Sequence, residues 1–373
     1  MKKTIGIVFG GRSGEHEISI RSAKAVFPLL DPSKYFAIPI AISADGKWLN
    51  PYESAGLLGD AISAEFVREF EEYKETTVGL IGDSTRKGLI VERGTNSEIL
   101  KIDVFFPILH GTYGEDGTIQ GLFEMADIAY VGCGVTASSC GMDKTVMKSL
   151  FRDAGLPICK YVWFTRKDWF NAPETTISNI EKELGFPCFV KPANLGSSVG
   201  ISNVKAKDEL AAAIDLAAQY DTKIVVEESL VMREIECAVI GNDIVEASRP
   251  GEYIIRNSSK AFLDYTEKYS GTGNNEFVVP APVSEELEKK IRDLSVKAFR
   301  SINGSGLARV DFFLRQDNGI LLVNEINTMP GLTDASGFPK MWEGSGAKFS
   351  DVIDMLIELA IERHSDRSKN KIT

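Results

Sequence analysis

The chain has 373 residues, of which 43% are hydrophobic and 25% charged, a globular profile that excludes wholesale disorder and a collagen-like structure. At about 150 residues per domain, this length predicts two or three domains. The 42 basic and 53 acidic residues give a net charge of −11, which disfavours a general nucleic-acid or anionic-membrane surface but permits a small basic pocket.

The N-terminus and the cysteines favour a cytoplasmic protein. MKKTIGIVFGGRSGEHE begins like a signal peptide, but glycines and charges interrupt its apolar stretch after Phe9, so we interpret it as a first strand. No apolar run approaches the ~18 residues needed to cross a bilayer. The 5 cysteines and 3 histidines show no metal-ligand spacing, and the odd cysteine count predicts reduced, mostly buried thiols.

Strand and helix patterns alternate in the first third of the chain. Strands are predicted over 4–9, 35–42 and 103–109, and helices over 18–30 and 117–126. This βαβ order predicts a parallel sheet, whose ligands gather in the loops at the carboxyl ends of the strands. The polar, weakly periodic stretch 53–96 is interpreted as a peripheral insertion without a role in a site.

The pattern changes after Gly132. A helix is predicted from Asp143 to Gly155, and its inward face is expected to hold Val146, Leu150, Phe151 and Ala154. Later strands are predicted over 187–191, 200–204, 223–228, 234–240, 243–247, 277–280, 307–315 and 319–327, and later helices over 208–220, 284–303 and 350–363. We expect an α/β protein with three domains, 1–132, 133–228 and 229–373.

The segment LARVDFFLRQDNGILLVNEINTMPG predicts a β-hairpin rich in polar groups. If 317–319 forms a three-residue loop, Asp311 lies opposite Glu325. The same register places Arg309 opposite Asn327, whereas a two-residue loop would put these pairs on opposite faces. Two facing carboxylates repel each other, and a divalent cation such as Mg²⁺ would remove that conflict. The alternative is a solvated face with an accidental acidic pair.

A second polar segment, VKPANLGSSVG, follows a strand that ends at Lys191. The small residues Gly196, Ser197 and Ser198 let backbone N–H groups approach phosphate oxygens, and the lysine supplies positive charge. Because the lysine precedes the glycines, the segment does not match the GxxxxGK[ST] pattern. The alternative is a Gly/Ser hairpin whose lysine extends into solvent.

Three further segments carry weaker signals. Lys144 opens a helix, and its alternative interpretation is an ordinary surface lysine. The strand KIVVEESL ends in acidic residues that could hold a nucleotide base, with Glu234 accepting a ribose hydroxyl, or could be a solvated strand end. The polar segment DYTEKYSGTG, with Lys268 and Tyr269, is interpreted as a lid over a phosphate or, alternatively, as a tyrosine-rich surface loop.

The loop GGRSGE after the first strand does not match GxGxxG, which disfavours a dinucleotide site. Instead it places Glu15 at the carboxyl edge of the sheet, where it could bind an ammonium group. His110 closes the third strand at the same edge. We therefore expect these two polar loops to face one crevice.

Together, the ordered motifs resemble the D-alanine–D-alanine ligase family of the ATP-grasp superfamily. The resemblance rests on GGRSGEHEIS, HGTYGEDGTIQG, MDK, VKPANLGSSVG, VEESL, REIECAV, YTEKY, ARVDFF and VNEINTMPGLT, from Ile5 to about Trp342. It implies an N-terminal parallel-sheet domain, with ATP bound between a central and a C-terminal ATP-grasp domain and a lid near 258–275. It also implies the ATP-dependent joining of two D-alanines through an acylphosphate, for peptidoglycan precursors, by a homodimer.

The resemblance further implies a role for each matched residue. Two Mg²⁺ ions, with Mn²⁺ as a possible substitute, would be held by Asp311, Glu325 and Asn327. ATP would contact Lys144, Lys191, Ser198, Glu227, Glu228, Ser229, Leu230, Glu234, Lys268, Asn324 and Glu325. The D-alanines would contact Glu15, His110, Ser336 and Gly337. Arg309 and the Gly331 amide would face the tetrahedral oxyanion, and Glu15, Ser197 and Tyr269 would form one hydrogen-bonded set.

Tyr269 favours dipeptide formation, because the related D-alanine–D-lactate ligases carry a histidine near this position, and a neutral tyrosine does not repel an incoming amine. The alternatives are such a D-lactate ligase, another ATP-grasp carboxylate–amine ligase, or a nucleotide-binding module that has lost turnover. The second would be expected to lack the Glu15, Ser197 and Tyr269 set. The third would be expected to lack Arg309 or a metal ligand, and this chain retains all of them. Four positions depart from the family pattern. Glu228 departs from it at the adenine contact, and Leu332, Gly337 and Phe338 depart from it near the second substrate site, whose shape they leave open.

Overall fold

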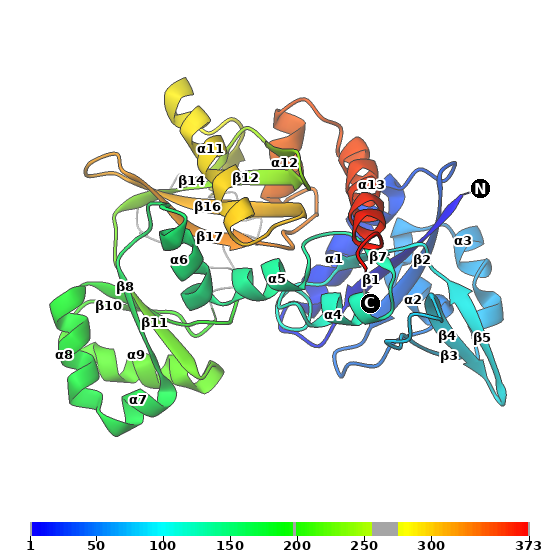
Figure 1. Cartoon of the computed structure of the whole chain (residues 1–373), viewed down its shortest axis with the longest axis horizontal. Helices are drawn as coiled ribbons and strands as arrows, with labels where there is room; N and C mark the ends of the chain where they lie inside the picture. Colours follow the sequence, from blue (N-terminus) through cyan, green and yellow to red (C-terminus); the bar gives the residue numbers. More distant parts are fainter. Residues whose placement is uncertain (1, 197–198, 256–274, 372–373) are drawn as a thin grey trace.

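The computed structural model describes residues 2–196, 199–255 and 275–371, which form four sheets and the helices that cover them (Figure 1). Four predicted site residues therefore lie outside the described residues, namely Ser197, Ser198, Lys268 and Tyr269. Nearly all of the predicted lid at 258–275 lies outside them as well. In the described part of the chain, no helix has the length and apolar character that a membrane crossing requires. The cysteines are free thiols, all but Cys140 buried, as predicted.

The N-terminal part contains the predicted parallel sheet, in the order β2 (Tyr35–Ile42), β1 (Lys3–Gly10), β6 (Val104–Ile108) and β7 (Ala129–Tyr130). β1 and β6 read as continuous apolar runs because both faces of a parallel sheet are covered. One face packs against α1 (His16–Val26) and the C-terminal helix α13 (Phe349–Arg367), and the other against α2 (Pro51–Leu58) and α4 (Thr118–Met125). Glu15 and His110 follow β1 and β6 at the same edge.

The stretch 53–96, interpreted as a peripheral insertion, is more closely integrated than predicted. It contributes to α2 and forms α3 (Ala64–Arg68), β3 (Thr77–Gly79) and β4 (Gly88–Arg93), which join the following strand β5 (Asn96–Lys101) in an antiparallel sheet. Its buried Phe70 and Leu89 belong to the same core cluster as Phe105 of β6. These few apolar anchors are far apart in the sequence, so a periodicity argument does not detect them.

The central sheet is antiparallel, in the order β10 (Ser202–Val204), β9 (Cys188–Pro192), β11 (Lys223–Glu228) and β8 (Tyr161–Thr165). One face packs on the helices α7 (Arg166–Asn171), α8 (Pro173–Glu183) and α9 (Lys207–Tyr220) through a core that includes Val190 and Val226. Because side chains alternate along a strand, Lys191 and Glu227 project from the opposite face. The sequence patterns predicted neither β8 nor α7 and α8.

The C-terminal sheet runs β15 (Asn275–Val278), β14 (Gly251–Ile255), β12 (Met232–Gly241), β16 (Gly306–Arg315) and β17 (Leu321–Asn327), and β13 (Val245–Ala247) also pairs with β12. One face is covered by α5 (Val135–Met142), α6 (Lys144–Asp153) and α11 (Glu285–Ser301). On the other face, Ala238, Ile240 and Leu307 join one core with the N-terminal sheet, α12 (Gly337–Gly344) and α13. Figure 1 shows α13 lying against the N-terminal strands.

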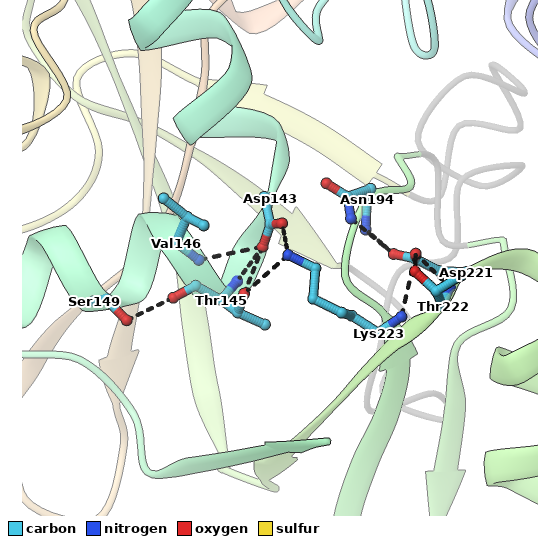
Figure 2. Close-up of polar contacts among 8 residues, drawn as sticks. All are labelled: Asp143, Thr145, Val146, Ser149, Asn194, Asp221, Thr222 and Lys223. Atoms are coloured by element: carbon cyan, nitrogen blue, oxygen red, sulfur yellow. Dashed lines mark hydrogen bonds and ion pairs between the residues drawn. The ribbon is translucent and has the colours of Figure 1, made fainter. Parts of the chain in front are cut away.

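The inward face of α6 differs from the prediction. Val146, expected inside, is 38% exposed, whereas Lys148 is buried together with Met147 and Phe151. The helix begins at Lys144 because the Asp143 side chain accepts hydrogen bonds from the backbone N–H groups of residues 145 and 146 (Figure 2). In the helix that starts there, Lys148 lies on the buried face.

The β16–β17 hairpin has the predicted pairs but not the predicted loop. Asp311 pairs with Glu325, and Arg309 pairs with Asn327. Nearer the turn the register is shifted by one residue, because the Arg315 backbone N–H bonds to the Ile320 carbonyl and four residues, 316–319, form the loop. A β-bulge at residue 324 compensates for the longer loop and restores the predicted pairs.

Candidate active site

A cavity of about 240 Å³ lies where loops of the N-terminal sheet meet the central and C-terminal sheets. It is lined by most of the described residues that the sequence singled out, namely Glu15, His110, Lys144, Lys191, Glu227, Glu228, Leu230, Glu234, Arg309, Asp311, Asn324, Glu325, Asn327 and Gly331. The two polar N-terminal loops therefore face one crevice, as predicted. Groups that are far apart in the sequence converge on one space.

Three other predicted residues are described but do not belong to this lining: Ser229, Ser336 and Gly337. Ser336 is 5% exposed, and its Oγ lies 2.8 Å from the Thr333 Oγ1. Gly337 begins α12 beside a cavity carboxylate, because a Cβ at this position would lie 2.4 Å from the Glu236 Oε2. Ser336 and Gly337 therefore sit just behind the cavity wall.

Three neighbouring strands place carboxylates side by side. Glu236 of β12 pairs with Asp311 of β16, which pairs with Glu325 of β17. Arg309 Nε and Nη2 donate to the two carboxylate oxygens of Asp311, both at 2.6 Å, and its Nε lies 3.3 Å from the Glu236 Oε2. Burial raises the pKa of Asp311 to about 7 with help from the neighbouring carboxylates, although Arg309 acts in the opposite direction.

This row of carboxylates suits a divalent cation. Asp311 and Glu325 face each other, and the Asn327 amide in the next row completes an all-oxygen ligand set of the kind that Mg²⁺ prefers. The raised pKa of Asp311 means that too little positive charge lies near its ionised form. A bound cation would supply that charge. Among the described residues, no group of three His, Cys, Asp or Glu could hold a metal by itself. A cation here would therefore need the amide and oxygens of a ligand.

Glu227 is clamped between two lysines. Its Oε2 lies 2.6 Å from the Lys191 Nζ, and its Oε1 lies 3.0 Å from the Lys148 Nζ. Burial raises the pKa of Glu227, but the two ammonium groups outweigh burial and hold this pKa at about 2. Lys144 lies nearby and donates to the Leu195 carbonyl at 2.8 Å, and burial lowers the pKa of Lys144. The cavity therefore has a basic wall in a chain of net negative charge.

A polar network anchors this basic wall (Figure 2). Lys223, at the start of β11, forms an ion pair with Asp143, the residue that caps α6. Asn194 donates through its backbone N–H and its Nδ2 to one carboxylate oxygen of Asp221, at 2.7 and 2.9 Å. These contacts fix the start of α6 and the loop after β9 against β11, and so position Lys144 beside the cavity.

The N-terminal edge of the cavity holds a buried histidine. The His110 Nε2 lies 3.0 Å from the Ser22 Oγ, and its Nδ1 lies 3.2 Å from the Met329 carbonyl and 3.6 Å from the Glu115 Oε1. Burial works to lower the pKa of His110, but Glu115 and Glu15 outweigh burial and raise it. The carboxylates of this edge would attract a ligand that carries an ammonium group.

Comparison with known proteins decides the family. The family model described as D-ala D-ala ligase N-terminus matches residues 4–133, and the model described as D-ala D-ala ligase C-terminus matches residues 150–358. The chain belongs to the D-alanine–D-alanine ligase family. A D-alanine–D-alanine ligase of Geobacillus thermodenitrificans is 46% identical over 367 residues, which are 98% of this chain and 98% of that protein. The enzyme of Heliobacterium modesticaldum is 43% identical over 370 residues, 99% of this chain and 98% of that protein.

Solved structures of D-alanine ligases share the fold. The VanG D-Ala:D-Ser ligase from Enterococcus faecalis gives a TM-score of 0.82 at 36% identity, over 96% of this chain and 100% of that chain. The D-alanine–D-alanine ligase from Coxiella burnetii gives 0.81 at 35% identity, over 99% and 96%. The predicted ATP-grasp architecture is therefore confirmed.

Sequence reasoning missed two charged residues in or next to this D-alanine–D-alanine ligase family site, Lys148 and Glu236, and it gave Glu115 no role although the HGTYGEDG motif contains it. Glu236 had a usable signal, since it alternates with Glu234 along β12 and so shares its face. Glu115 lies in the polar loop that begins at His110 and follows the third predicted strand, and its place in that loop was the available signal. Lys148 stands one helical turn after Lys144 and shares its face, but nothing in the sequence distinguished it from an ordinary surface lysine.

Proposed function

We propose that this chain joins two D-alanine molecules into D-alanyl-D-alanine, with cleavage of one ATP to ADP and phosphate, for peptidoglycan precursors. One observation carries the proposal: the motifs that match the family, spread along the chain from Glu15 to Gly331, converge on a single cavity. The first D-alanine carboxylate attacks the γ-phosphoryl group of ATP and becomes an acylphosphate. The amine of the second D-alanine then attacks that carbonyl, and phosphate leaves from the tetrahedral intermediate.

Glu15 and His110 bind the first D-alanine in this proposal. Glu15 accepts hydrogen bonds from the substrate ammonium group, for which it is suited as a carboxylate beside Glu115 at the cavity edge. His110 lies near the substrate carboxylate, and its raised pKa favours the cationic form that attracts an anion. The carboxylate and the ammonium of one small amino acid thus meet groups of opposite charge.

The basic wall binds the nucleotide. Lys144 and Lys191 contact the phosphates, while Glu234 accepts a ribose hydroxyl. Glu227, Glu228 and the Leu230 backbone, all in the cavity lining, contact the adenine base, which would enter beside the clamped carboxylate of Glu227. The Ser229 backbone, which follows Glu228 directly, is assigned the same role on the family resemblance. Asn324 contributes to the same wall through the bulge in β17.

Asp311, Glu325 and Asn327 would hold two Mg²⁺ ions, or Mn²⁺ in their place, together with phosphate oxygens of ATP. Bound there, the ions supply neutralisation of the charge on the transferring phosphoryl group. Arg309 and the Gly331 amide stabilise the tetrahedral oxyanion, and both line the cavity. Asp311 and Glu236 orient the Arg309 guanidinium from two sides, so the donor is in place before charge develops.

The remaining roles stay predictions. Ser336 and Gly337 contact the second D-alanine through an opening of the wall that α12 forms. Ser197, Ser198, Lys268 and Tyr269 contribute a substrate-bridging set and a phosphate-binding lid, and they lie outside the described residues. We also propose a cytoplasmic homodimer, on the family resemblance alone.

A Mg·ATP assay with D-alanine tests the proposed reaction. We expect phosphate release that depends on D-alanine, a product with the mass of the dipeptide, and no release with L-alanine. The absence of D-alanine-dependent release would contradict the proposal. Offering D-lactate or D-serine together with D-alanine tests the second site, and preference for either competitor would replace dipeptide formation by the corresponding alternative.

A further inference from the structure

Lys148 is a buried cation to which the proposed mechanism gives no task. Its side chain is 1% exposed, and its Nζ lies 3.0 Å from the Glu227 Oε1. The Nζ also donates to the Asn324 carbonyl at 3.4 Å and to the Cys159 Sγ at 3.5 Å. Burying an ammonium group is unfavourable unless good partners compensate, so a lysine at this depth calls for an explanation.

Lys148 covers one oxygen of the Glu227 carboxylate. Its Nζ lies 3.0 Å from Oε1, and Oε1 is buried. The two oxygens of a carboxylate together offer about four acceptor sites, so two lysines do not use all of them. Glu227 lines the cavity, so a donor group on a ligand can approach its carboxylate.

The three elements around Lys148 hold its ammonium group in place. α6 carries the residue, β11 carries Glu227, and the β17 bulge presents the Asn324 carbonyl. The Asp143–Lys223 ion pair fixes the same helix to the other end of β11 (Figure 2). The Lys148 ammonium group therefore has a fixed position. Because Lys148 binds one oxygen of the Glu227 carboxylate and Lys191 binds the other, the two lysines restrict this carboxylate to one orientation.

We propose that Lys148 is a positioning residue for nucleotide selection: by holding Oε1 it keeps the Glu227 carboxylate ionised and oriented, so that the carboxylate accepts from the exocyclic amino group of adenine. The inference rests on the proposed contact between Glu227 and the base. An ionised carboxylate is acceptor-only, so it favours a base with an amino donor and disfavours one with a carbonyl oxygen at that position. Lys148 thus contributes to the choice of ATP without touching it.

Kinetics with ATP and ITP test this role, because ITP carries a carbonyl where ATP carries the amino group. We would measure kcat/KM for both nucleotides by D-alanine-dependent phosphate release. The ratio of the two values within one preparation does not depend on the folded fraction. Lys148→Met removes the ammonium group and keeps an apolar chain of similar length. Lys148→Gln replaces it if the methionine variant does not fold.

Lys223→Met is the matched control, since it also removes a lysine that fixes α6 but leaves Glu227 untouched. We expect Lys148→Met to lower the ATP/ITP preference about tenfold, equivalent to ~1.4 kcal/mol. In Lys223→Met the kcat/KM values for ATP and ITP can both fall. The ratio of the two should stay within about twofold of the wild-type ratio, since no contact with the base changes.

Two results would overturn the inference, and they distinguish a wrong role for Lys148 from a wrong base contact for Glu227. If Lys148→Met lowers both values equally, Lys148 only supports the helix, and the proposed base contact of Glu227 stands. If Glu227→Gln itself leaves the ATP/ITP preference unchanged, the base contact is wrong, and the role of Lys148 falls with it.

Discussion

The clamp around Glu227 makes the stability of the ligand-free protein sensitive to acid. Its pKa is about 2 in the folded chain, against an ordinary value of 4.5. At ~1.4 kcal/mol per pKa unit, this difference corresponds to about 3 kcal/mol of stability. Because the folded-state pKa is lowered, the contribution is complete well above pH 4.5 and is lost as the pH falls towards 2.

Glu227→Gln isolates this contribution. The amide leaves Lys148 and Lys191 without a negative partner, and breaking a buried pair in this way destabilises by ~3–5 kcal/mol near neutral pH. At about pH 3 the wild type retains less than half of the stability that ionised Glu227 contributes. The difference in free energy of unfolding between the wild type and Glu227→Gln should therefore become smaller. Urea unfolding without nucleotide, followed by tryptophan fluorescence across this pH range, measures the difference.

A matched substitution separates this effect from the general action of acid. Glu98→Gln removes an exposed carboxylate of β5, and we expect a difference from wild type near zero at every pH. A loss of stability in Glu227→Gln that is the same at both ends of the pH range would refute the reasoning. It would mean that the two lysines do not hold Glu227 ionised.

Two further predictions concern the carboxylate row. Arg309→Ala should lower turnover at least ~100-fold and leave the affinity for ADP nearly unchanged, because it removes an oxyanion donor worth ~3–4 kcal/mol. Normal turnover in this variant would exclude Arg309 from the mechanism. Gly337→Ala should also lower turnover, since its Cβ would lie 2.4 Å from the Glu236 Oε2 and displace a group that orients Arg309. Gly121→Ala, where a Cβ meets nothing within 4 Å, is the control, and equal rates for the two glycine variants would contradict the argument.

Apolar runs bounded by polar or turn-forming residues made the N-terminal strands predictable. The strand expected over 35–42 has the observed bounds of β2, and the sheet is parallel as expected. β8 escaped prediction because it is an edge strand of the central sheet, where Trp163 is 49% exposed, so it shows no clean alternation of buried and exposed residues. Short helices such as α7 give too few turns for a periodic pattern.

The carboxylate row could be predicted from the sequence, because the alternation of side chains along a strand brings Asp311 and Arg309 to one face whatever surrounds them. Lys148 was not readable on its own terms. A lysine is usually exposed, and only its partner makes burial tolerable. That partner, Glu227, comes much later in the chain, and the ion pair joins α6, which is capped at Asp143, to β11.

The bulge at Asn324 connects these two halves of the site. With the four-residue loop and no bulge, Asp311 would face Asn324, and Glu325 would move to the opposite face of β17. The extra residue returns Glu325 to the cavity and leaves Asn324 unpaired within the ladder. The Asn324 carbonyl accepts a hydrogen bond from Lys148, so the irregularity that aligns the carboxylates also supports the lysine that clamps Glu227. Metal ligation and recognition of the base would then depend on the same local distortion of one strand.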